Sequence, residues 1–135
     1  MNTTETRSVI VERDIAHPPE KLWRALTQPY LIEEWIGMKG DLKPEVGHNF
    51  SFAGEWGSVD CQVVSVEPNL SLAYKWDAFG LESTVTWTLT PTSTGTHLRM
   101  EQAGFRTDQE QYFQGASASW PQFITTLEAV VGKLD

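Results

Sequence analysis

The sequence is poor in cysteine and in long apolar runs. Its one cysteine, Cys61, excludes an intramolecular disulfide framework and a metal site built from several cysteines. No apolar run approaches about 18 residues, so no membrane-spanning helix is expected. The opening stretch MNTTETRSVI lacks the apolar segment of a secretory signal. These absences lead us to expect a cytoplasmic protein in a reducing compartment, with no membrane partner.

Basic residues are also few, and they are scattered along the chain. The sequence has 10 Lys and Arg against 18 Asp and Glu, which gives a formal net charge of −8. Such a surface repels the phosphates of nucleic acids. We therefore expect no nucleic-acid partner, and the charge chiefly predicts solubility.

Patterns that carry chemistry are missing as well. His17, His48 and His97 have no His, Cys or acidic neighbour at the spacing of metal ligands. No phosphate-binding glycine loop or nucleophile-elbow motif is present, and Cys61 is expected to pack as a small apolar residue. Acidic side chains could still converge across a sheet as an acid–base pair. We expect no metal and no cofactor, and we assign no catalytic residue.

The chain has 135 residues, the length of one domain. Along it, segments with the apolar periodicity of strands and of helices follow one another. Residues 7–15 alternate as a strand. Pro18–Pro19 and Pro29 can each begin a short helix, because the N–H that proline lacks is not used in a first turn. Thr27 is expected to cap the second helix, and Gly37 to end it.

From residue 48 onward the apolar period becomes two, which indicates strands. The expected strands span residues 48–54, 58–68, 70–76, 81–91 and 96–104. The adjacent Val63 and Val64 leave the register of the second of these ambiguous or bulged. Short turns between neighbouring strands imply an antiparallel sheet with one solvent-facing side.

The period changes again near the end of the chain, to that of an amphipathic helix over residues 109–133. Pro121 interrupts it and predicts a kink or a late start there. The predicted fold class is α+β, with one curved antiparallel sheet against one long C-terminal helix and two short helices after the first strand. We expect the short helices to fill the gap between the first two strands, and residues 1–135 to form a single domain.

The stretch HPPEKLWRALTQPYLIEEWIG (residues 17–37) holds two proline-initiated segments, two Trp and a final Gly. With the Arg of VERDI, the stretch VVSVEPNLSLAYKW and the Trp120 helix, it resembles the heat shock protein 90 ATPase activator-like family. That family lies in the SRPBCC (START and birch-pollen-allergen-like) superfamily, and the resemblance covers nearly the whole chain. His17 stands where the family usually has Ala, and Ile36 where a second aromatic residue is usual.

The resemblance implies a helix-grip fold, in which a curved sheet wraps around the C-terminal helix, often with a cavity between them. Family members bind hydrophobic small molecules, act in stress response or resistance, or have no assigned activity. The chaperone activators themselves carry a further N-terminal domain, whereas this sequence starts directly at its predicted first strand. We therefore do not expect the family name to describe its activity.

The predicted inward face is rich in aromatic side chains. A curved sheet and one helix of radius about 5 Å leave a gap that side chains need not fill. An apolar wall with a few polar groups is typical of a ligand pocket. The predicted lining residues are Phe50, Phe52, Tyr74, Trp76, Ser83, Val85, Trp87, Met100, Gln102, Trp120 and Phe123. The alternative is a closed core in which the Trp side chains fill the gap.

Three functions stay open. The favoured one is non-catalytic binding of a small hydrophobic or aromatic molecule by a monomer or homodimer, with a role in stress response or resistance. The second is a cyclase- or hydrolase-like enzyme in the same cavity, which requires two titratable groups facing inward. The third is a chaperone-associated interaction module, which requires an exposed apolar patch of more than a few hundred Å².

Overall fold

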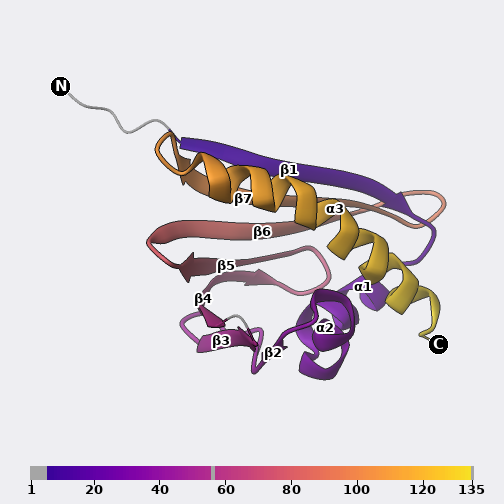
Figure 1. Ribbon diagram of the computed structural model, residues 1–135. Helices are drawn as coiled ribbons and strands as arrows, with labels where there is room; N and C mark the ends of the chain where they lie inside the picture. Colours follow the sequence, from indigo (N-terminus) through magenta and orange to yellow (C-terminus); the bar gives the residue numbers. More distant parts are fainter. Residues whose placement is uncertain (1–5, 56, 135) are drawn as a thin grey trace.

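The computed structural model describes residues 6–55 and 57–134. A curved antiparallel sheet lies against one long helix, and two short helices follow the first strand (Figure 1). The α+β helix-grip arrangement expected from the sequence is confirmed. No helix among the described residues is long and apolar enough to span a membrane.

Seven strands form the sheet in the order β1-β7-β6-β5-β4-β3-β2. Their bounds are β1 Thr6–Ile15, β2 Lys39–Gly40, β3 Asn49–Gly54, β4 Gly57–Glu67, β5 Ser71–Ala78, β6 Leu81–Pro91 and β7 Thr96–Arg106. All neighbouring pairs are antiparallel. The first strand therefore pairs with the last one, while β2 forms the opposite edge.

The alternation in the sequence determines which side of the sheet is buried. Along β6, the apolar residues and Ser83 point inward, while the intervening Thr residues are more exposed. The adjacent valines produce the predicted bulge, because the pairing of β4 with β5 shifts register between Val63 and Ser65. Val59, Cys61 and Val63 are buried before the bulge, whereas after it Ser65 is exposed and Val66 is half-buried, because the extra residue reverses the alternation.

The prolines begin both short helices, α1 (Pro19–Thr27) and α2 (Pro29–Ile36). Gly37 ends α2 in the left-handed conformation, with φ 77°, as predicted. Thr27 does not cap α2, so that prediction is wrong. It is the last residue of α1, and its hydroxyl donates to the carbonyl oxygen of Trp23 at 2.7 Å.

The long helix α3 (Glu110–Gly132) crosses the inner face of the sheet and packs against β1, β7 and α2 (Figure 1). It begins well before Pro121 and continues through it, so a late start is wrong. β1 and β2 lie at opposite edges of the sheet, and α1 and α2 connect them while contacting α3.

Trp35 links the two short helices to the sheet. Its indole N–H donates to the buried carbonyl oxygen of Ala25 at 2.8 Å. In a continuous helix that carbonyl would accept the N–H four residues later, but residue 29 is proline and has none. Trp35 thus supplies the missing donor, and its ring meets Trp87 of β6 edge-on, with ring centroids 5.6 Å apart.

Replacing Trp35 by Phe should lower the free energy of unfolding by about 2–3 kcal/mol. The change removes the indole donor, leaves the Ala25 carbonyl unpaired in the core and shrinks the ring. Urea denaturation followed by far-UV circular dichroism measures the effect. Tyr30→Phe is the control, because Tyr30 is 62% exposed on the same helix and should change stability by less than about 0.5 kcal/mol. Equal stabilities for the two variants would contradict the role of the indole.

Candidate ligand-binding pocket

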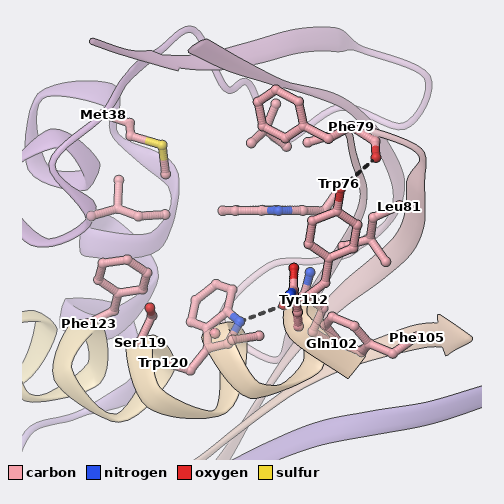
Figure 2. A pocket seen from close by; sticks show the side chains of 16 residues that line it. Met38, Trp76, Phe79, Leu81, Gln102, Phe105, Tyr112, Ser119, Trp120 and Phe123 are labelled. Atoms are coloured by element: carbon pink, nitrogen blue, oxygen red, sulfur yellow. Dashed lines mark hydrogen bonds between the residues drawn. The ribbon is translucent and has the colours of Figure 1, made fainter. Parts of the chain in front are cut away.

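A pocket of about 350 Å³ opens between the first half of α3 and the inner side of the sheet (Figure 2). The walls are mostly apolar and include many aromatic rings. The lining residues are Ile36, Met38, Val59, Trp76, Ala78, Phe79, Leu81, Gln102, Phe105, Gln111, Tyr112, Gly115, Ala116, Ser119, Trp120 and Phe123. The open space thus lies toward the end of the molecule where α3 begins.

The size of the α3 side chains accounts for where the gap stays open. Gly115, Ala116 and Ser119 face the pocket and are too small to reach the sheet. In the second half of the helix, Ile124 and Leu127 are fully buried and fill the space against the core. The position of the pocket therefore follows from the sequence of α3, in which the small residues facing the sheet are followed by large ones.

Four of the predicted lining residues lie on the pocket wall: Trp76, Gln102, Trp120 and Phe123. The ring centroids of Trp76 and Trp120 are 5.5 Å apart, and Trp120 meets Phe123 edge-on, also at 5.5 Å. Figure 2 shows Trp76 reaching across the pocket above Trp120, while Phe123 and Met38 lie on the side facing them. The two indoles and Phe123 form a continuous aromatic surface.

The other seven predicted residues lie outside the lining of this pocket. They are Phe50, Phe52, Tyr74, Ser83, Val85, Trp87 and Met100, and all are buried. The aromatic ones among them pack on each other: the centroids of Phe50 and Phe52 are 5.3 Å apart, and the Trp87 indole donates to the Tyr74 hydroxyl at 3.1 Å. In this part of the molecule side chains fill the gap, as in the closed-core alternative.

A series of buried and half-buried hydrogen bonds begins at the pocket wall. The indole N–H of Trp120 donates to Gln102 Oε1 at 2.7 Å, and Gln102 Nε2 donates to Ser83 Oγ at 3.0 Å. The Ser83 hydroxyl in turn donates to the carbonyl oxygen of Trp76 at 2.6 Å. A primary amide has two N–H groups and two lone pairs on its oxygen. Gln102 therefore keeps one N–H and one lone pair beyond these contacts, on the wall of the pocket.

Sequence reasoning missed the residues at the mouth of the pocket, chiefly Phe79 and Tyr112. Phe79 lies in the β5–β6 turn, and Tyr112 lies in the first turns of α3, outside the apolar stripe of that helix. The Tyr112 hydroxyl donates to the carbonyl oxygen of Phe79 at 2.9 Å (Figure 2). The sequence does mark this position, because Phe79 directly precedes Gly80 in a turn, where small polar residues are usual.

The buried titratable groups near the pocket are held neutral. Burial, with the negative charges of Asp60 and Asp77, raises the pKa of the Cys61 thiol to about 12. Burial also raises the pKa of the Tyr74 hydroxyl above its usual range. Neither group can supply an anion near neutral pH, so neither is placed to act as a nucleophile or base.

A polar cluster around His97 lies on the solvent-facing side of the sheet, away from the pocket. His97 binds Glu12 through Nε2 at 2.9 Å and Asp14 through Nδ1 at 2.7 Å. These hydrogen bonds, to Glu12 and then Asp14, raise the pKa of His97. Within the described residues no group of three or more His, Cys, Asp or Glu is placed to hold a metal ion.

Residues 16–132 match the family model described as Activator of Hsp90 ATPase homolog 1-like protein. Protein MLL2253 from Mesorhizobium loti is 57% identical, with a TM-score of 0.92 over 96% of this chain and 99% of that chain. A comparison with curated proteins finds no match.

Two more distant solved structures share the fold. CalU16 from Micromonospora echinospora is 28% identical, with a TM-score of 0.79 over 95% of this chain and 78% of that chain. Protein BH1534 from Bacillus halodurans is 24% identical, with a TM-score of 0.83 over 96% of this chain and 99% of that chain.

The native protein should resist thiol reagents even at mildly alkaline pH. Cys61 is only 6% exposed and its pKa is raised to about 12, so raising the pH from neutral to about 9 should not create the reactive thiolate. Ellman's reagent, followed by the absorbance of the released thiolate, should label the folded protein at least about 100-fold more slowly than the protein in guanidinium chloride. Equal rates in the two conditions would contradict this environment for Cys61.

Proposed function

The chain belongs to the Activator of Hsp90 ATPase homolog 1-like family of the SRPBCC superfamily, and we propose that it binds a small aromatic molecule in the pocket beside α3. Binding involves no covalent chemistry in this proposal. The observation that carries it is the pocket itself, at about 350 Å³. Ligand sites in proteins commonly measure roughly 300–1,000 Å³ and combine apolar walls with a few placed polar groups.

The chemistry of the walls supports an aromatic ligand in particular. Trp76, Trp120 and Phe123 present ring faces and edges to the same space. Aromatic pairs prefer offset or edge-to-face contacts, which contribute about 0.5–1.5 kcal/mol beyond the burial of area. We propose that Gln102 orients the ligand through its remaining amide N–H and lone pair, because it is a buried polar side chain on this wall.

The make-up of the lining favours binding over an enzymatic role. Acid–base catalysis requires titratable groups within hydrogen-bond reach of the reacting atoms. Among the described residues that line the pocket, Tyr112 alone has an ordinary acid–base side chain, and its hydroxyl already donates to the Phe79 carbonyl. A cyclase- or hydrolase-like activity therefore receives less support from this site than binding does.

Filling the pocket should abolish binding. N-phenyl-1-naphthylamine, a neutral aromatic dye whose fluorescence rises in apolar surroundings, should bind the wild-type protein saturably with one site per chain. Ala116→Phe places a ring in the pocket and should weaken binding at least about 10-fold, since a steric clash of a few kcal/mol has that effect. The matched control is Ala118→Phe, at an exposed position of the same helix outside the pocket lining. Equal dye affinity in the two variants would contradict binding at this site.

The pocket should also prefer aromatic ligands that carry one hydrogen-bonding group. In displacement of the same dye at neutral pH, 1-naphthol should bind about 2- to 10-fold more tightly than 1-methylnaphthalene, because one hydrogen bond contributes a net 0.5–1.5 kcal/mol. The two competitors have nearly the same shape, so the comparison isolates the polar group. Equal affinities would exclude an orienting role for Gln102.

A further inference from the structure

The turn between β5 and β6 has a backbone that its sequence does not favour. Ala78 pairs with Leu81, so Phe79 and Gly80 form a two-residue hairpin turn, with φ values of 53° and 86°. Turns of this kind need positive φ at both central residues and therefore favour Asn-Gly. A bulky side chain at positive φ is a true outlier, because its Cβ crowds the following carbonyl. Asn at position 79 would adopt this backbone with less strain.

The position of the Phe79 side chain indicates what offsets this strain. The ring lines the pocket, yet the residue is 66% exposed, so it is not a core residue placed there for burial. It extends over Gly57, where an added Cβ would lie 3.3 Å from the ring. Figure 2 shows Phe79 above Trp76 at the border of the pocket.

Two hydrogen bonds hold the tip of this hairpin against the start of α3. The Tyr112 hydroxyl donates to the Phe79 carbonyl at 2.9 Å, and Gln109 Nε2 donates to the Gly80 carbonyl at 3.1 Å. The two elements meet at the mouth of the pocket, and Tyr112, itself 39% exposed, adds its own ring to the wall. The strained residue is therefore fixed in place from across the mouth.

We infer that Phe79 is a ligand-contacting residue whose ring covers a bound aromatic molecule at the mouth of the pocket, and that Tyr112 is its positioning residue. Strained backbone persists where the surrounding structure imposes it, and such positions cluster at ligand sites. With a ligand in place, the exposed part of the Phe79 ring is covered and loses contact with water. This inference rests on the proposed function, and it adds that the turn controls how long a ligand stays bound.

Phe79→Asn should separate folding from binding. Asn-Gly suits the turn, so the melting temperature should stay equal or rise by about 2–5 °C. Affinity for N-phenyl-1-naphthylamine should fall at least about 5-fold, because the covering ring is gone. Phe79→Tyr restores the ring at the same strained position and should bind the dye within about twofold of the wild type.

Tyr112→Phe tests the positioning role without removing a ring from the wall. The variant loses only the hydroxyl that holds the Phe79 carbonyl. The dye should therefore dissociate about 3- to 10-fold faster in stopped-flow experiments, which corresponds to the net contribution of one hydrogen bond. The association rate should change less. A dissociation rate equal to that of the wild type would overturn the positioning role.

The outcomes distinguish this inference from the proposed function. If Ala116→Phe abolishes dye binding while Phe79→Asn binds like the wild type, the pocket stands and the role of Phe79 is overturned. A Phe79→Asn variant that loses affinity and also melts at a lower temperature would likewise overturn it, since Phe79 would then be a structural residue. If Ala116→Phe has no effect on binding, the proposed function itself fails.

Discussion

The pocket depends on the chain of hydrogen bonds that runs from Trp120 through Gln102 and Ser83 to the backbone of Trp76. It joins α3 to β7, β6 and β5 in turn, so one helix and three strands share a single polar connection. Each member is buried or half-buried, and a buried polar group left without a partner costs about 1–3 kcal/mol. These hydrogen bonds therefore tie the Trp120 indole to the backbone of β5 at Trp76.

The space between sheet and helix divides into a packed part and an open part. The packed part holds rings such as Phe52, Tyr74 and Trp87, which are almost completely buried. The open part faces the small residues of α3, Gly115, Ala116 and Ser119. A pocket can therefore exist in a chain so rich in Trp, because the rings of the packed part lie outside its lining. Phe79 lies at the border of the open part.

Much of this fold can be predicted from local sequence rules. Proline at the start of α1 and α2, Gly37 at the end of α2 and the valine pair at the bulge each act through backbone geometry that a few neighbouring residues determine. Thr27, two residues before Pro29, resembles a helix cap in the sequence, but its hydroxyl donates to the carbonyl oxygen of Trp23. Which inward aromatic residues meet the pocket depends on the curvature of the sheet and on side-chain sizes across the gap. Periodicity identifies the inward face but not the gap, so Trp76 and Phe52 look equivalent in the sequence.

The pairing of β1 with β7 has a consequence for how the protein is made. Thr6 pairs with Arg106 and Ile15 with Thr96, so β1 cannot complete its pairing before β7, the last strand of the sheet, has been synthesised. Contacts so distant in sequence slow folding, because a long loop has to close before they form. Until residue 106 has emerged, the β1 segment cannot complete its pairing in the sheet. Synthesis of the C-terminal third of the chain is therefore the step that commits the domain to its final topology.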